Sequence, residues 1–198
     1  MCRTANGYDV NWFNDWVIAA NKFIAGESVD YNFLSTGQQK DGRGNICPAT
    51  IILPTLAMEA KKKVKEDQDI IECFMSILDK AITDCKDELI ERYNWIGAQD
   101  SRSASFMYDN GTMFGYIPQE GIKSALKHGT LAVGQIGLSE ALKILIGCDH
   151  TTKKGMKVAK QIEQLFKDRC AEFKEKYQLN FGVYYTPRFS GCFVGDNK

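Results

Sequence analysis

The stretch Cys47-Pro48-Ala49-Thr50-Ile51-Ile52-Leu53-Pro54 decides the fold class. It is short, apolar and rich in β-branched side chains, and a proline stands near each end. These properties predict a buried strand over residues 47–53 rather than a helix. Residues 130–136 and 180–186 are runs of the same kind, and Pro187 closes the second. The chain therefore carries three predicted strands.

Amphipathic helices are predicted between the strands. Apolar residues recur at helical spacing in several segments. These segments are residues 10–25, 69–96 and 156–177. Shorter helices are predicted through residues 56–60, over 118–127 where Pro118 suits a first turn, and over 138–146 with Gly147 at the end. Long helices between short apolar strands indicate parallel strands in βαβ units. The helices have more apolar surface than three strands can cover, so the pattern indicates part of a larger α/β structure.

The polar segment at residues 27–45 is predicted to be a long loop. Loops of this length in a compact domain are uncommon and are usually functional or cover another element. Residues 98–117 are mixed in character and contain turn signals at Asp100 and at Asn110-Gly111.

Composition excludes several classes of protein. The 198 residues hold 25 Lys+Arg and 25 Asp+Glu, so the chain has no net charge to attract nucleic acid or a membrane surface. No apolar run approaches the ~18 residues of a membrane span, and no signal-like run stands at the start. Seven cysteines without a Cys-x-x-Cys pair, and only two histidines, argue against a zinc site. The scattered cysteines are typical of reduced thiols in the cytoplasm.

A set of ordered motifs resembles the anaerobic (class III) ribonucleoside-triphosphate reductase large chain. The motifs are Cys2-Arg3-Thr4, Gly42-Arg43-Gly44-Asn45, Thr50-Ile51-Ile52-Leu53-Pro54, the block from Lys127 to Leu138, Asn180-Phe181 and Tyr185-Thr186-Pro187. The resemblance covers residues 1–187 and corresponds to a central part of that family's catalytic barrel. Residues 188–198 form a divergent tail.

The resemblance implies a fold and a chemistry. The family has a ten-stranded α/β barrel with a loop through its centre, and a cysteine at the loop tip becomes a thiyl radical. That radical abstracts the 3′ hydrogen of a ribonucleoside triphosphate on the way to the deoxyribonucleotide, an oxidoreductase step that supplies DNA replication. The family uses a glycyl radical made by an iron–sulfur activase with S-adenosylmethionine. It also uses ATP or dNTP effectors, zinc in a C-terminal domain, usually formate as reductant, and a homodimeric assembly.

The resemblance assigns roles to three residues. Cys2 matches the thiyl position, Asn45 the asparagine that holds the ribose hydroxyls, and Thr186 a candidate phosphate contact. The residue types suit these tasks, since an amide both donates and accepts and a strand-end hydroxyl can bind an anion. Each also has a structural alternative. Cys2 could belong to a loose terminus, Asn45 to a glycine-rich turn, and Thr186 to a plain strand end.

Three neighbouring positions are predicted to be structural. Cys47 is expected to be a core cysteine before its strand, with a place in the active-site pocket as the alternative. His128, in Lys-His-Gly-Thr, is expected to make structural hydrogen bonds rather than act in catalysis. Ile52 has no predicted role.

The regulatory ATP-binding domain and the glycyl radical domain have no counterpart in these residues. The sequence therefore predicts a reductase fragment that is inactive alone, with the remaining reductase segments and the activase as partners. The alternative is a non-catalytic α/β module that binds a nucleotide or a reductase subunit. An incomplete sheet would leave edges and an apolar face exposed, which predicts self-association.

Overall fold

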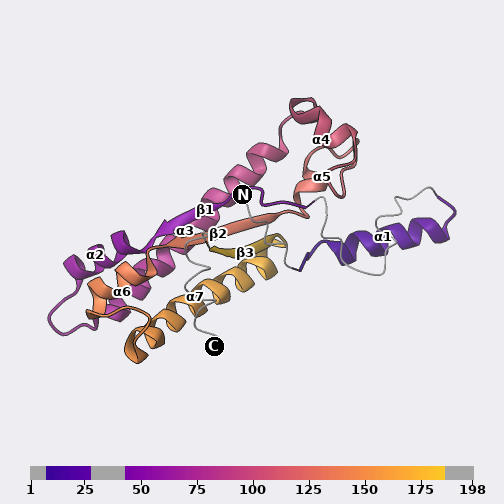
Figure 1. The fold of residues 1–198 in the computed structure, drawn as a ribbon. Coiled ribbons are helices and arrows are strands. Elements are labelled where there is room, and N and C mark those ends of the chain that lie inside the picture. Colours follow the sequence, from indigo (N-terminus) through magenta and orange to yellow (C-terminus); the bar gives the residue numbers. More distant parts are fainter. Residues whose placement is uncertain (1–7, 28–42, 186–198) are drawn as a thin grey trace. The chain divides into compact units, whose positions relative to one another are not determined.

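The computed structural model describes residues 8–27 and 43–185 of the chain. Figure 1 shows the order of the elements, which alternates strands with helices as predicted. The elements are α1 (Trp12–Ile24), β1 (Ala49–Ile52), α2 (Leu53–Lys63), α3 (Ile70–Gly97), the 3-10 helix η2 (Ser101–Ala104), α4 (Ser105–Asp109), α5 (Lys123–Leu126), β2 (Thr130–Ile136), α6 (Leu138–Ile146), α7 (Lys153–Tyr177) and β3 (Asn180–Tyr185).

The three predicted strands form one sheet in the order β1-β2-β3. Strands β1 and β2 pair in parallel, with Ala49 opposite Val133 and Ile52 opposite Ile136. The prediction of an α/β fold with parallel strands and intervening helices is confirmed.

The chain divides into two compact units. Within the described residues, the first unit takes residues 8–27, 43–47, 89–132 and 172–182, and the second takes residues 48–88, 133–171 and 183–185. Elements α3, β2, α7 and β3 each contribute residues to both units.

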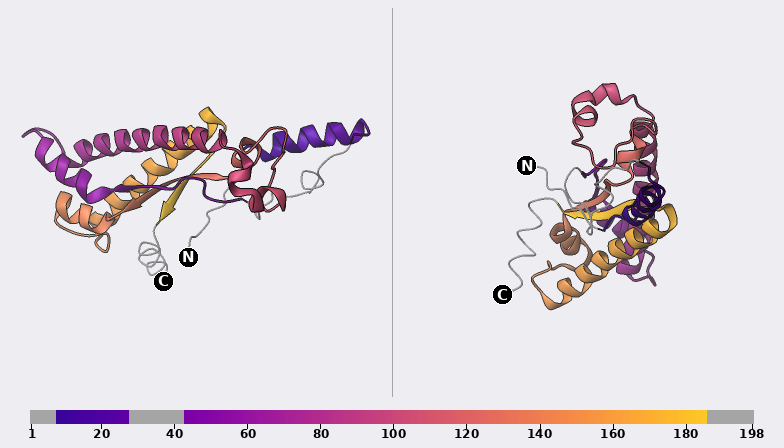
Figure 2. Two further views of the ribbon diagram at one scale, coloured as in Figure 1. Left: turned by 90° about the horizontal axis from the view of Figure 1, so that it is seen from above. Right: turned by 90° about the vertical axis from the view of Figure 1, so that its right-hand side faces the viewer.

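In the second unit, α2 packs against α6, and the two helices lie close to each other in Figure 1 and in the left view of Figure 2. The buried residues of α2 are Leu53, Ala57 and Ala60, a helical spacing that builds one apolar face. Gly137, at the start of α6, has φ +82°, and a Cβ there would lie 2.5 Å from the Pro54 ring. The close approach of these two helix starts therefore requires glycine.

Helices α3 and α7 supply the other packed surfaces of the second unit. Phe74, Leu78 and Ile82 of α3 are fully buried and stand four residues apart. An ion pair joins the two helices, because Arg169 Nε and Nη2 lie 2.5 and 2.7 Å from the carboxylate oxygens of Asp79. Gln135 of β2 donates a hydrogen bond to Glu163 of α7.

One face of the sheet carries exposed apolar side chains. Ile52 is 57% exposed, and its cross-strand neighbour Ile136 is 37% exposed. Ile51, which points to the opposite face, is buried. Side chains of the described residues therefore cover one face of the β1–β2 pair more completely than the other.

The segment before β2 differs from its prediction. A helix over residues 118–127 was expected because proline suits a first turn, but only Lys123–Leu126 is α-helical. Gly121, with φ +72°, places its N–H 3.0 Å from the Ile117 carbonyl oxygen in a tight turn. Because of this turn, the helix begins only at Lys123.

The segment at 98–117 also holds more structure than turn signals indicate. It contains η2 and α4. Asp100 explains the start of η2, because its side chain accepts a hydrogen bond from the Arg102 backbone N–H at 2.9 Å.

No helix in the described ranges is both long enough and apolar enough to cross a membrane. Four of the described cysteines, Cys47, Cys73, Cys85 and Cys170, are buried, as expected of core residues.

Candidate functional site

Asn45 lies in a short parallel bridge that leads into β1. It pairs with Thr130, the first residue of β2. The Thr130 N–H donates to the Gly44 carbonyl oxygen, and the Ile46 N–H donates to the Thr130 carbonyl oxygen, both at 2.9 Å. These hydrogen bonds fix the backbone on both sides of Asn45. They therefore determine on which face of the paired segments the half-buried Asn45 side chain lies.

Gly129 allows this bridge to form. A Cβ at residue 129 would lie 2.6 Å from Ile46 Cγ1 and 3.0 Å from the Gly44 carbonyl oxygen. Both distances are at or below the closest normal approach of such atoms. Glycine at this position is therefore required for close contact with the Asn45 segment.

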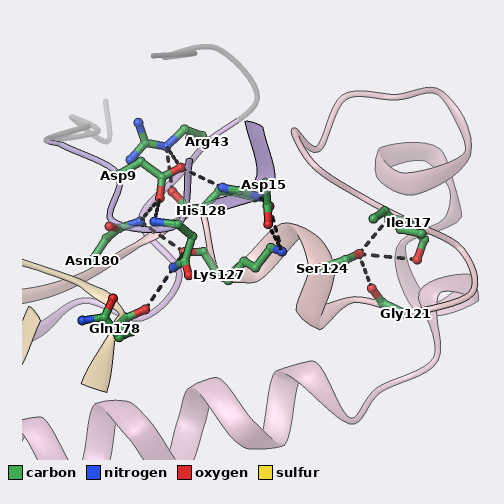
Figure 3. Close-up of polar contacts among 11 residues, drawn as sticks. Asp9, Asp15, Arg43, Ile117, Gly121, Ser124, Lys127, His128, Gln178 and Asn180 are labelled. Atoms are coloured by element: carbon green, nitrogen blue, oxygen red, sulfur yellow. Dashed lines mark hydrogen bonds and ion pairs between the residues drawn. The ribbon is translucent and has the colours of Figure 1, made fainter. Parts of the chain in front are cut away.

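A buried ionic cluster surrounds the residue before that glycine (Figure 3). His128 is fully buried, and its ring lies between two carboxylates. Nδ1 is 2.7 Å from Asp9 Oδ2, and Nε2 is 3.0 Å from Asp15 Oδ2. The Phe114 ring packs edge-on against the imidazole at a centroid distance of 4.9 Å.

Further groups complete the cluster. Arg43 Nε donates to the His128 carbonyl oxygen at 2.7 Å and lies 3.9 Å from Asp9 Oδ2. Lys127 Nζ lies 2.8 Å from Asp15 Oδ2. Asn180, the first residue of β3, donates to Asp9 Oδ1 at 3.0 Å and accepts from the Val10 N–H at 2.9 Å. The cluster therefore joins residues from five separate parts of the first unit's chain: the segment before α1, α1 itself, residue 43, residues 127–128 and β3.

The contacts in the cluster favour its charged forms. Burial alone would lower the pKa of His128, but the contacts with Asp15 and Asp9 outweigh burial and raise the pKa above its ordinary 6.5. Burial alone would raise the pKa of Asp9 and Asp15. For Asp9, hydrogen bonds with His128 and Asn180 outweigh burial and lower the pKa below 3.8. For Asp15, hydrogen bonds with His128 and Lys127 do the same.

The sequence predictions for this region have different outcomes. The structure describes Asn45, whereas Cys2 and Thr186 lie outside the described residues. Cys47 is buried at 6% exposure, and burial raises the pKa of its thiol. Cys47 is thus a core residue without the properties of an activated nucleophile. The prediction that His128 makes structural hydrogen bonds is confirmed.

Sequence reasoning did not identify the partners of His128. Arg43 and Asn180 occur in the quoted motifs, but no role was predicted for them. Asp9 and Asp15 flank the start of α1 and carry no motif. Their only sequence signal is a pair of acidic residues six apart beside a predicted helix start, which does not indicate a distant histidine.

No candidate metal centre accompanies the cluster. Among residues 8–27 and 43–185, no group of three or more His, Cys, Asp or Glu side chains is placed to hold a metal ion.

Comparison with known proteins assigns the chain to a class. A family profile described as anaerobic ribonucleoside-triphosphate reductase matches residues 2–192. The chain belongs to this family of enzymes. It is 26% identical over 160 residues to the anaerobic ribonucleoside-triphosphate reductases of Escherichia coli (strain K12) and Salmonella typhimurium. Each alignment covers 78% of this chain and 22% of the relative, so the chain spans about a fifth of their length.

Solved structures agree on the fold. A structure described as anaerobic ribonucleotide reductase superposes with a TM-score of 0.56 at 18% identity, covering 81% of this chain and 24% of that one. The anaerobic ribonucleotide reductase from Thermotoga maritima with glycerol in the active site gives 0.55 at 17% identity, covering 75% and 22%. At these identities the likeness concerns the fold alone.

Proposed function

We propose that this chain forms the part of an anaerobic ribonucleoside-triphosphate reductase barrel that carries the radical cysteine and the ribose-binding asparagine. In this proposal residues 1–187 contribute to a ten-stranded α/β barrel, and residues 188–198 are a divergent tail. The observation that carries the proposal is the bridge around Asn45. Thr130 makes 2.9 Å backbone hydrogen bonds with Gly44 and with Ile46. These bonds hold the backbone on both sides of Asn45, the residue that the family motif marks as a substrate contact.

The proposed chemistry divides between Cys2, Asn45 and Thr186. The Cys2 thiyl radical takes a hydrogen atom from the ribose, which forms the S–H bond, breaks the C3′–H bond and leaves the unpaired electron on carbon. The Asn45 amide holds the ribose hydroxyls by donating one hydrogen bond and accepting another. The Thr186 hydroxyl contacts the substrate phosphates. The family's glycyl radical, generated by its S-adenosylmethionine iron–sulfur activase, supplies the unpaired electron.

The proposal includes partners that complete the enzyme. They are the activase, the remaining reductase segments, ATP or dNTP effectors, formate as reductant and a second copy in a homodimer. The zinc of the family belongs to a different domain. We propose a cytoplasmic location, because seven scattered cysteines are typical of reduced thiols in a reducing compartment.

Nucleotide binding tests the assignment of Asn45. Isothermal titration of the chain with a ribonucleoside triphosphate, in the presence of the complementary reductase segments, is compared for the native chain and Asn45→Ala. Loss of one amide that makes two hydrogen bonds is expected to weaken binding about tenfold. Asn110→Ala is the matched control, because Asn110 is an exposed turn asparagine that hydrogen-bonds its own α4 carbonyl at Phe106.

Activity measurements distinguish the two functional alternatives. Ribonucleotide reduction is measured under strict anaerobiosis with activase, first for the isolated chain and then with the complementary segments. The proposal expects turnover only in the complemented mixture and none with Cys2→Ser. Turnover by the isolated chain would contradict the proposal that other segments are needed. Tight binding by the isolated chain without turnover in any mixture would favour a non-catalytic nucleotide-binding module.

A further inference from the structure

The placement of the His128 ring determines which of its forms fits the site. Both ring nitrogens lie within 3.0 Å of a carboxylate oxygen, Asp9 on one side and Asp15 on the other. A neutral imidazole has one N–H and one lone pair. In the neutral form one nitrogen would therefore point its lone pair at a carboxylate. The fully buried ring has no solvent contact to relieve that repulsion, so the geometry fits the imidazolium.

His128 also contacts the segment that carries Asn45. Its carbonyl oxygen accepts the Arg43 Nε–H at 2.7 Å, two residues before Asn45. Two residues after His128, Thr130 makes the backbone hydrogen bonds on either side of Asn45. One short piece of chain, residues 128–130, thus holds the segment before α1 through its ring and the lead-in to β1 through its backbone.

We propose that His128 is a positioning residue for Asn45 and that it acts as an imidazolium. In this form it fixes Asp9, Asp15 and Arg43 around the start of β2, and the lead-in at residues 43–46 is held in the register that orients the Asn45 side chain. Loss of the ring proton leaves one nitrogen with a lone pair against its carboxylate, which removes that contact and loosens that register. The role of Asn45 in binding substrate rests on the proposed function. The coupling between His128 and Asn45 is argued from the contacts in the structure and does not depend on that role.

The charged groups around the ring explain why the effect is local. Asp9 and Asp15 each carry one negative charge, and Lys127 and Arg43 each carry one positive charge. These four charges already balance, so deprotonation of His128 leaves no net charge in the cluster. It replaces one attractive N–H contact with a lone pair against a carboxylate. The response is therefore expected to be a change of contacts at the ring rather than a general electrostatic expansion.

Nuclear magnetic resonance of the full chain tests the proposal. The sequence contains two histidines, so His150→Gln assigns the ring ¹⁵N signals of His128 without ambiguity. At pH 7.5, about one unit above the ordinary value for histidine, both ring nitrogens of His128 are expected to carry protons. The side-chain amide signal of Asn45 is expected to change with the same midpoint as the His128 ring. A singly protonated ring at this pH, or an Asn45 signal that ignores the titration, would overturn the proposal.

Asp15→Asn provides a milder test than replacing the histidine. It removes one carboxylate from the ring and keeps Asp9 in place. The His128 midpoint is expected to fall by about one pH unit, a tenfold loss of proton affinity, and the Asn45 amide signal is expected to shift. The control is Asp100→Asn, which removes an exposed carboxylate paired with Arg102 and is expected to change neither signal. If Asp15→Asn behaves like the control, the positioning role is wrong. Failure of the proposed function would instead abolish the nucleotide effect of Asn45→Ala and leave this coupling unchanged.

Discussion

At the scale of single residues, close packing at Gly129 determines whether the bridge around Asn45 can form. A hydrogen atom is the only side chain that fits between this backbone and the Ile46 side chain. Gly44, one residue before Asn45, shows the opposite environment, because a Cβ there would meet no atom within 4 Å. The two glycines therefore form a matched pair on opposite sides of one bridge.

Gly129→Ala is expected to lower the free energy of unfolding by about 1–3 kcal/mol, because the added methyl group forces Ile46 and the Gly44 carbonyl away. Gly44→Ala is expected to stay within about 0.5 kcal/mol of the native chain. Urea unfolding followed by circular dichroism measures both values. Equal effects of the two substitutions would show that the contact at Gly129 does not constrain the bridge.

Residue roles were predictable only where a motif or a local pattern carried them. The short motif before β1 indicated Asn45, whose role as a substrate contact stays a prediction, and the glycine after His128 indicated a structural histidine. The pairing of His128 with Asp9 and Asp15 spans more than 110 residues of chain, and no local spacing encodes it. The role of Arg43 follows from where the His128 carbonyl lies, which only the folded chain defines.

At the scale of elements, the α3–α7 pair in the second unit depends on more than its apolar stripes. Arg169 and Asp79 form a bidentate ion pair that is about one-third exposed on each side. Bidentate geometry and partial burial make such a pair stronger than a typical surface ion pair. The pair also fixes the axial position of one helix against the other within this unit.

A double-mutant cycle measures this contribution. Arg169→Gln, Asp79→Asn and the double substitution are compared by chemical unfolding, and a coupling energy of about 0.5–1.5 kcal/mol is expected. The same cycle on the fully exposed pair of Arg102 and Asp100 is the control, and no measurable coupling is expected there. A coupling near zero for the α3–α7 pair would mean that its apolar contacts alone set the helix positions.

The elements themselves were largely predictable from periodicity. The strand at 130–136 and the helix at 138–146 match their predicted bounds, since β-branched runs and helical stripes report burial directly. The predicted helix at 118–127 is wrong over its first half. Pro118 suits the first turn of a helix, but Gly121 has a positive φ, which a right-handed helix cannot include. The chain therefore forms a turn around Gly121 instead of a helix.

At the scale of the whole molecule, the sequence predicts more apolar helix surface than three strands can cover. The described residues form three strands, and Ile52 and Ile136 stand exposed side by side on one face. The ten-stranded barrel of our proposal rests on the family resemblance alone, because no local pattern in these residues encodes strands outside them.

Self-association through this face is the expected consequence. Exposed apolar side chains on a sheet face with open edges favour pairing with another copy. Ile52→Thr keeps a β-branched residue in the strand and removes apolar surface, so the fold is retained while association weakens. The expected loss is about 1–2 kcal/mol, which is roughly a tenfold increase in the dissociation constant. Sedimentation velocity over a concentration series measures it. Trp95→Gln is the control, because Trp95 is 66% exposed on α3 and lies outside the sheet. A native chain that stays monomeric at every concentration and melts cooperatively would contradict the expectation.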